Sequence, residues 1–204
     1  MALEAWCPRC PHPLSDDGVC ADHGAQPPLR RPETSSYEAF ALHLEGAGQF
    51  PTYLPWPMSP GWSVTDFAYV EGPLATLTCV SGTSELDGPV DAVVVAEEPG
   101  VGLGGRCAGL DRSDPGPSWG SGTPAVRVRI GSKSVGMWPV SVSETNGEWD
   151  RSVFAGEAGG RWLWIVLRPA SAMLLLRDEW ILRDVSGVGP PLVEMPFHGP
   201  RPPW

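Results

Sequence analysis

The chain has 204 residues, of which 42% are hydrophobic, and its formal net charge is -10. This length gives room for one packed domain and a small appendage. Because a general nucleic-acid binder presents a basic surface, the acidic balance argues against nucleic acid as a partner. The 25 glycines and 24 prolines predict many turns and short strands rather than long helices.

No segment has the length or composition of a membrane span. The longest apolar run, residues 162–167, is far shorter than the roughly 20 residues that cross a bilayer as a helix. The N-terminus lacks a basic region followed by an apolar run, so we expect no signal peptide and a cytoplasmic protein. In that reducing compartment, Cys79 and Cys107 are expected to be buried thiols rather than a disulfide.

The clearest chemical signal is a C-x₂-C…C-x₂-H pattern at the N-terminus. Cys7 and Cys10 form the first pair, and Cys20 and His23 form the second. Each short step turns the backbone so that two side chains face one point, and zinc prefers four thiolate or imidazole ligands in a tetrahedron. We therefore expect one Zn²⁺ bound by these four residues. It is expected to be structural, because four protein ligands leave no position for water.

Residues 1–26 are accordingly expected to form a zinc ribbon. So short a segment cannot bury a core of its own, and zinc binding would contribute about 10 kcal/mol or more to its folding. His12 is a further possible ligand, but its two-residue offset from Cys10 suits a tetrahedron less well than His23 does.

Residues 27–50 are expected to form a stiff linker and a short amphipathic helix. Ser35 and Glu38 resemble a capping box, and Gly46 and Gly48 close the helix. This helix either packs on the main domain or binds a partner. Its apolar face follows the i, i+3, i+4, i+7 pattern of Tyr37, Phe40, Ala41 and Leu44.

Residues 51–187 are expected to form an α+β domain that is mostly antiparallel β. The continuously apolar segment 92–96 is typical of a central strand buried on both faces. Residues 170–176 read as a helical turn or a bend. The segments rich in β-branched and apolar residues are 63–70, 75–81, 90–97, 125–130, 135–143, 152–158, 161–168 and 179–185.

Two proline-rich segments flank these strands. Residues 51–62 hold four prolines among aromatic residues, which predicts an extended segment that either closes the core or lines a groove. Residues 188–204 predict an extended tail, either a loose terminus or a ligand for a proline-binding module.

A glycine-rich segment follows the strand at 90–97. Gly100, Gly102 and Gly105 match G-x-G-x-x-G, but we do not expect a dinucleotide site. The turn-forming residues at 111–117 leave little room for the helix that such a site needs, and Glu97 and Glu98 would repel phosphate. The glycines are expected to let the backbone pass close to a strand or a ligand.

Several motifs are distributed over most of the chain. They are C-x-x-H-G at 20–24, LPWP at 54–57, GW at 61–62, AEEPGVGLG at 96–104, DPGP at 114–117, FAGEA at 154–158 and WLW at 162–164. Together they resemble a family of uncharacterised actinobacterial proteins, a domain of unknown function with an N-terminal zinc ribbon. Its members are sometimes labelled phosphotransacetylase. Those enzymes are larger α/β proteins, and no motif of theirs aligns with these residues.

The function expected from these features is non-enzymatic. The protein would bind or regulate a protein partner or a small ligand, near the proline- and tryptophan-rich segment and the glycine-rich loop. The candidate ligand-binding residues are Trp56, Trp62, Glu97, Glu98, Gly100, Gly102, Gly104, Glu157, Trp162 and Trp164.

The alternative is a transferase or hydrolase that uses carboxylates near the glycine-rich loop, with Glu97, Glu98, Asp111 and Glu157 as candidate acids. No Ser/His/Asp arrangement is visible in the sequence. A concave pocket holding Glu97 or Glu157 with a perturbed pKa would favour the enzyme.

Overall fold

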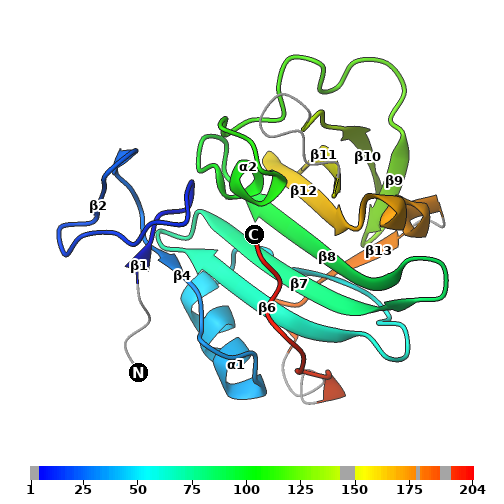
Figure 1. The fold of residues 1–204 in the computed structure, drawn as a ribbon, viewed down its shortest axis with the longest axis horizontal. Helices are drawn as coiled ribbons and strands as arrows, with labels where there is room; N and C mark the ends of the chain where they lie inside the picture. The colour runs from blue at the N-terminus through cyan, green and yellow to red at the C-terminus, as the bar shows by residue number, and fades with distance from the viewer. Residues whose placement is uncertain (1–4, 143–149, 178–179, 189–193) are drawn as a thin grey trace.

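The computed structural model describes residues 5–142, 150–177, 180–188 and 194–204 (Figure 1). These residues form thirteen strands, two α-helices and one 3₁₀ helix. In chain order they are β1 (Ala5–Trp6), β2 (Val19–Cys20), β3 (Gly24–Ala25), β4 (Leu29–Arg30), α1 (Tyr37–Ala47), β5 (Tyr53–Pro55), β6 (Ser63–Val70), β7 (Ala75–Ser84), β8 (Gly88–Glu97), α2 (Leu103–Ala108), β9 (Val126–Ile130), β10 (Lys133–Pro139), β11 (Ser152–Ala158), β12 (Arg161–Arg168), η1 (Ala170–Arg177) and β13 (Trp180–Asp184).

Eleven strands form one sheet, in the order β1-β4-β6-β7-β8-β12-β11-β10-β9-β13-β5. Every described pair in it is antiparallel except β13 with β9, which confirms the mostly antiparallel, α+β-like class. β2 and β3 pair separately. The central position of β8, between β7 and β12, explains its apolar segment at 92–96, because both faces of the strand are covered.

The predicted strands are close to those observed. β6, β11 and β12 begin and end at the predicted residues. The apolar piece at 170–176 is helical, as one of the two alternatives predicted. Residues 143 and 179, at the ends of two predicted strands, lie outside the described residues. The short β5 was expected only as an extended segment. It lies at the edge of the sheet, where a proline can be accommodated although it has no N–H to donate.

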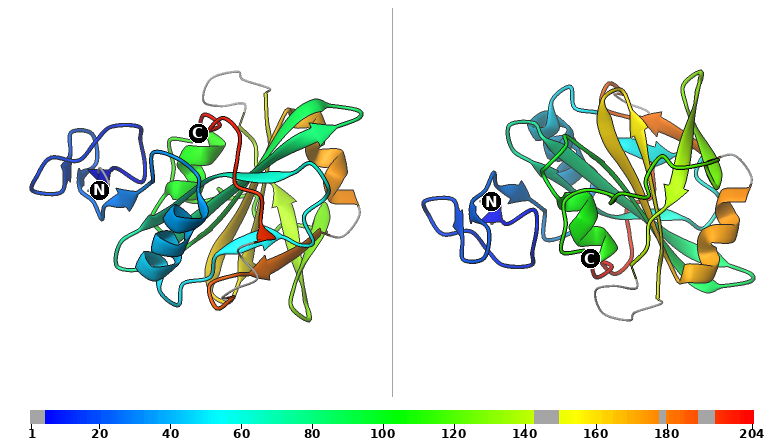
Figure 2. Two further views of the ribbon diagram at one scale, coloured as in Figure 1. Left: turned by 90° about the horizontal axis from the view of Figure 1, so that it is seen from below. Right: turned by 90° about the horizontal axis from the view of Figure 1, so that it is seen from above.

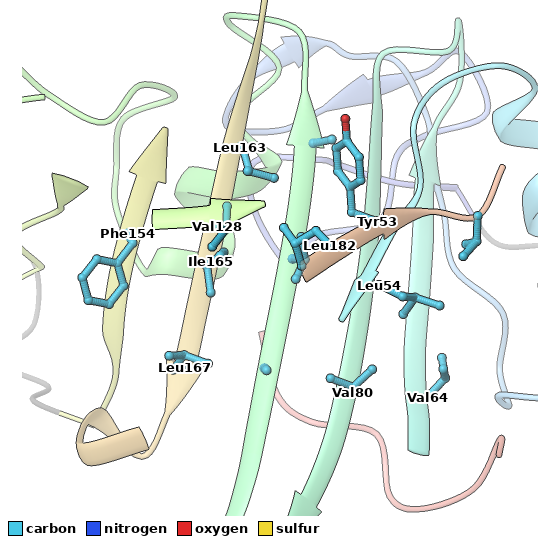
Figure 3. Packing of buried hydrophobic residues seen from close by; sticks show 14 of the residues in the cluster. Tyr53, Leu54, Val64, Val80, Val128, Phe154, Leu163, Ile165, Leu167 and Leu182 are labelled. Carbon is cyan, nitrogen blue, oxygen red and sulfur yellow. The ribbon is translucent and has the colours of Figure 1, made fainter. Parts of the chain in front are cut away.

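The sheet curls so that its β13–β5 end lies over its middle. Hydroxyls on β7 fasten this arrangement, because Thr76 Oγ1 donates to the carbonyl of Pro51 and Thr78 Oγ1 to that of Tyr53, each at 2.5 Å. Figure 3 shows Leu54 and Leu182 of the folded-over strands beside the inner side chains of the sheet. An inner core forms within the curl.

The outer face of the same sheet carries a second core. Side chains of β12 alternate between the two: Leu163 and Ile165 point into the inner core, while Trp164 and Val166 point outwards. Figure 2 shows α1 in front of the sheet from below and α2 in front from above, so the two helices lie on opposite sides. Leu103 of α2 belongs to the outer core.

The helix α1 was predicted in the right place but with a slightly different cap and face. Its N-cap is Ser36, whose Oγ accepts the N–H of Ala39 at 3.1 Å, while Ser35 donates instead to the carbonyl of Thr65. Tyr37 is exposed, in contrast to the prediction. The residues that α1 buries are Phe40, His43 and Ala47, and Ala41 is exposed.

Close packing of α1 explains this rotation. Gly46 lies within the helix and not at its end, and a Cβ on it would lie 2.3 Å from the Tyr69 ring. The absent side chain lets α1 approach β6 there, and that contact sets which face is buried. No helix among the described residues is long and apolar enough to span a membrane.

The described part of the C-terminal segment is docked, so the expectation of a loose tail is wrong for residues 194–204. The N–H of Val64 donates to the carbonyl of Pro196 at 2.8 Å, and Ser63 Oγ donates to that of His198 at 2.8 Å. The Phe197 ring packs 5.4 Å from that of Phe40. Apolar burial and strand-like pairing with β6 thus hold the segment. Residues 189–193 lie outside the described part of the chain.

His43 should make the fold acid-sensitive. It is buried among Phe40, Phe67 and Tyr69 with neither ring nitrogen hydrogen-bonded, and burial lowers its pKa from 6.5 to about 3. Below pH 6.5 the His43 side chain takes up a proton in the unfolded chain but stays neutral in the folded chain. Stability therefore falls with pH, by about 2 kcal/mol at pH 5 from this residue.

Chemical denaturation between pH 7.5 and 4 would measure this effect. His43→Leu should remove its share of the slope, and replacement of the exposed His198 by Gln should leave the slope unchanged. An identical slope in wild type and His43→Leu would contradict the assignment.

Candidate metal centre

The four residues of the N-terminal pattern meet at one point. The ligand atoms of Cys7, Cys10, Cys20 and His23 all lie within 4.8 Å of one another. The Nδ1 atom of His23 is 3.7 Å from the Cys7 sulfur and 3.6 Å from the Cys20 sulfur, and the sulfurs of Cys10 and Cys20 are 3.5 Å apart. Zn–S and Zn–N bonds of about 2.3 and 2.0 Å give tetrahedral edges of roughly 3.5–3.8 Å. The donor set fits zinc.

Short strands hold these ligands. Cys7 follows β1, Cys20 ends β2, and His23 lies in the turn before β3. Cys7 and Cys20 are buried, whereas Cys10 and His23 are partly exposed. The backbone N–H of Arg9 points at the Cys7 sulfur, 3.4 Å away, as expected for a C-x₂-C turn around a thiolate. All five cysteines of the chain are free thiols, with Cys79 and Cys107 buried in the outer core.

His12 belongs to a second, overlapping group. The ligand atoms of Cys10, His12 and Asp22 also lie within 4.8 Å of one another. His12 and Asp22 are both exposed, and the His12 Nδ1 atom lies 2.8 Å from an Asp22 carboxylate oxygen. The Cys7, Cys10, Cys20 and His23 set has four donors and is better buried, so it remains the stronger candidate.

Two arginines tie the metal-binding segment to the glycine-rich loop. The guanidinium of Arg9 donates to the carbonyls of Gly100 and, at 3.2 Å, Val101. In return, Arg106 of α2 donates to the carbonyl of Cys7 at 2.7 Å. Figure 1 shows the N-terminal segment projecting from the sheet beside α2. At Gly102, where φ is +91°, a Cβ would lie 3.0 Å from the Arg9 side chain, so this contact requires glycine.

The carboxylate of Glu97 organises the loop from beneath. Glu97 is fully buried, and its Oε2 accepts the N–H groups of Gly102, Leu103 and Gly104 at 3.0, 2.7 and 3.3 Å. In a dinucleotide site such amides bind a pyrophosphate, whereas here they bind the chain's own carboxylate.

The expectation of little room for a helix after the glycines is wrong. The helix α2 begins at Leu103 and has six residues. The first N–H groups of a helix need acceptors, and Glu97 supplies one for three of them. A favourable interaction of the carboxylate with the helix N-terminus adds to this.

Burial raises the pKa of Glu97 from 4.5 to about 7. The three amides, and the indole N–H of Trp164 nearby, lower it and oppose the rise. The indole does not reach hydrogen-bond geometry, since Trp164 Nε1 and Glu97 Oε1 are both buried without partners. Desolvation is the larger effect.

Other candidate residues have packing roles around the same loop. Trp164 is fully buried, and a Cβ on Gly104 would lie only 2.2 Å from the Cδ1 atom of the Trp164 ring. Trp162 packs edge-on against Trp119 with ring centroids 4.5 Å apart. Trp162, Trp164 and Gly104 are therefore expected at these positions because their side chains and backbone pack together in the outer core.

Two of the three remaining candidate acids, Glu98 and Glu157, hold local structure near the surface. Glu98 forms an ion pair with Arg161 at 2.9 Å. Glu157 accepts the N–H of Gly160 at 2.6 Å and so closes the β11–β12 turn. Neither lines one of the two hollows described for this structure, whereas Asp111, the fourth candidate acid, lines the hollow beside the metal centre.

Trp56 and Trp62 belong to a different place. They line a hollow of about 320 Å³ together with Met58, Ser59, Pro60, Gly61, Glu194, Met195 and Pro196. Arg183 lies over the Trp56 ring at 4.8 Å. The predicted ligand-binding residues therefore divide between this hollow and the glycine-rich loop.

Sequence reasoning missed the arginines and the C-terminal tryptophan. Trp204 lies between the guanidinium groups of Arg31 and Arg106, at 4.1 and 4.8 Å from its ring centroid. Its indole N–H donates to the buried carboxylate of Asp66 at 2.7 Å, and Arg31 pairs with the same carboxylate. Nothing in local spacing connects residues so far apart in the chain.

Fold and site together define a curled antiparallel sheet with an N-terminal Cys/His centre docked on its outer side. The chain matches, over residues 1–203, the model described as Family of unknown function (DUF6758), and it belongs to this family. The resemblance predicted from the motifs is confirmed at the level of a domain of unknown function. Neither the curated proteins nor the solved structures contain a significant match.

Glu97 should make stability fall as pH rises. Because its pKa is raised from 4.5 to about 7 on folding, the folded chain holds a proton more tightly than the unfolded chain. About 3 kcal/mol of stability, present below pH 4.5, is lost as pH rises through 7. Glu97→Gln should remove this dependence in denaturation curves from pH 5 to 8. The neighbouring, partly exposed Glu98→Gln is the matched control, and equal behaviour of the two variants would refute the assignment.

Gly104→Ala should destabilise the protein by about 2–3 kcal/mol. Alanine is the better helix former, but its Cβ would collide with the Trp164 ring, which is fully buried and cannot move aside. Thermal denaturation would measure the change. Gly187→Ala, where a Cβ meets nothing within 4 Å, is the control. A neutral or stabilising effect at Gly104 would show that this packing is wrong.

Proposed function

We propose that this protein is a non-enzymatic binding or regulatory protein of the cytoplasm, built around a structural zinc centre at Cys7, Cys10, Cys20 and His23. The observation that carries the proposal is the convergence of four Cys and His donors, each within 4.8 Å of the others. Three thiolates and one imidazole are the donor set of structural zinc sites, and harder cations prefer oxygen ligands.

The zinc has a structural role in this proposal. Four protein donors complete its tetrahedron, so no position remains for a reacting water. Residues 5–26 hold only short strands, and their described contacts with the domain include the two arginine hydrogen bonds. Metal binding would order the Cys7–Arg9 turn and so place the Arg9 side chain and the Cys7 carbonyl against the glycine-rich loop.

The positions of the carboxylates favour binding over catalysis. Glu97 is fully buried and engaged by three amides, Glu98 is in a surface ion pair, and Glu157 holds a turn. A general acid or base must reach its substrate, and a fully buried carboxylate whose Oε2 atom is bound by three backbone amides does not. The raised pKa of Glu97 therefore has a structural cause, and Asp111 is the one candidate acid that lines either of the two described hollows.

Metal content and thermal stability test the proposal together. Gently purified protein should contain one zinc per chain by inductively coupled plasma mass spectrometry. Cys20→Ser should lose the zinc and lower the melting temperature by several degrees, since it removes a buried ligand. A strong chelator should produce the same shift in the wild-type protein, and added zinc should reverse it.

Cys79→Ala is the matched control. Cys79 is also a buried thiol, but it lies in the outer core away from the centre. This variant should keep one zinc per chain, although it loses some packing energy. Wild-type protein that folds without metal, with Cys7, Cys10 and Cys20 open to alkylation, would overturn the zinc centre.

A further inference from the structure

We propose that the hollow between the metal centre and α2 binds a small oxyanion, a molecule presenting a phosphate or carboxylate group. This inference rests on the proposed zinc centre, because four residues of the hollow, Arg9, Cys10, Pro11 and His23, belong to the metal-binding segment. The hollow has a volume of about 320 Å³, at the lower end of the range for small-molecule sites. Its lining includes Arg9, Arg106, Asp111, Arg112 and Ser113.

The charge of this lining is opposite to that of the chain. The lining includes three arginines, Arg9, Arg106 and Arg112, and one acidic residue, Asp111, although the chain as a whole has a net charge of -10. A Zn²⁺ with three thiolates carries a charge of -1. Arginine side chains therefore outnumber carboxylates in the lining by three to one, which favours an anion in spite of the charge on the zinc centre.

Two of these arginines are not neutralised by acidic partners. The hydrogen bonds of Arg9 go to the carbonyls of Gly100 and Val101, and that of Arg106 goes to the carbonyl of Cys7. None of the ion pairs among the described residues includes either of them. Other arginines do pair with carboxylates, for example Arg30 with Glu71 at 2.7 Å and Arg161 with Glu98 at 2.9 Å.

Both groups are also held in place before any ligand arrives. Arg9 is fixed by the loop carbonyls, and Arg106 is fixed by the Cys7 carbonyl and by the Trp204 ring, 4.8 Å away. Groups ordered in advance lose little conformational freedom on binding. The planar guanidinium fork matches the paired oxygens of a phosphate or a carboxylate. The Ser113 hydroxyl adds a neutral donor to the lining.

The same geometry gives the glycine-rich loop a role that differs from that of a phosphate loop. Its amides at Gly102, Leu103 and Gly104 are occupied by Glu97 and face inwards. The anion would be bound by side chains on the other side of the loop, beside the metal centre. The site therefore depends on arginine side chains and not on backbone amides.

Calorimetric titration of zinc-loaded protein tests this proposal. Inorganic phosphate and citrate are the two probes, which distinguish phosphorylated from carboxylated ligands, and sodium chloride at equal ionic strength is the blank. We expect saturable 1:1 binding of at least one probe, weakened by added salt. Arg112→Gln should weaken it about tenfold, since it removes one charged donor.

Asp111→Asn gives a change in the opposite direction. Removing the carboxylate of the hollow should tighten binding about threefold, and a variant that merely failed to fold could not bind more tightly. Arg129→Gln removes the same charge from an exposed position on β9 and should have no effect beyond that of ionic strength. Zinc content is measured on each sample.

Two outcomes would overturn the inference. One is the absence of binding by either probe to protein that contains one zinc per chain. The other is binding that Arg112→Gln and Asp111→Asn leave unchanged, which would indicate an adventitious ion only. In both cases the zinc centre itself would stand, whereas protein without zinc would refute the proposed function instead.

Discussion

The hydrogen bonds from three backbone amides to the buried Glu97 carboxylate are the constraint on which the outer side of this fold depends. A carboxylate without solvent is costly, and here the amides of the glycine-rich loop offset that cost. The bonds fix where the chain leaves β8 and where α2 begins. Because α2 then lies against Trp164, at a distance that requires glycine at position 104, the loop and the sheet become one packed unit.

That unit is the platform for the N-terminal segment. Two sets of hydrogen bonds, from Arg9 to the carbonyls of the loop and from Arg106 to the Cys7 carbonyl, join two parts of the chain that are about ninety residues apart. Arg106 also supports the ring of Trp204, so the metal-binding segment, the loop and the C-terminal segment meet around one side chain. Loss of the proposed zinc would thus act on more than the segment that holds it, because it would remove the partners of α2.

The inner core depends on a different set of contacts. It forms because the sheet curls over itself and α1 covers its side, burying His43 without a hydrogen-bond partner among aromatic rings. The two buried titratable groups respond to pH in opposite directions. Acid destabilises the fold through His43, whose pKa burial lowers, and higher pH destabilises it through Glu97, whose pKa burial raises. The His43 contribution changes between about pH 3 and 6.5 and the Glu97 contribution between 4.5 and about 7, so the two opposite slopes nearly cancel where these ranges overlap, and the summed stability is greatest there.

Local spacing was enough to predict three features: the strands with alternating or continuous apolar residues, the short helix after the linker, and the Cys/His set that converges on one point. The hydrophobic period of a strand or helix and the spacing of metal ligands are properties of residues close together in the chain, so they can be recognised without knowing the fold. Only the tertiary structure decided which face of α1 is buried, why the glycine-rich loop starts a helix, that residues 194–204 are docked, and that Arg9, Arg106 and Trp204 meet. Each of these depends on contacts between residues far apart in the chain, whose partners no local pattern names.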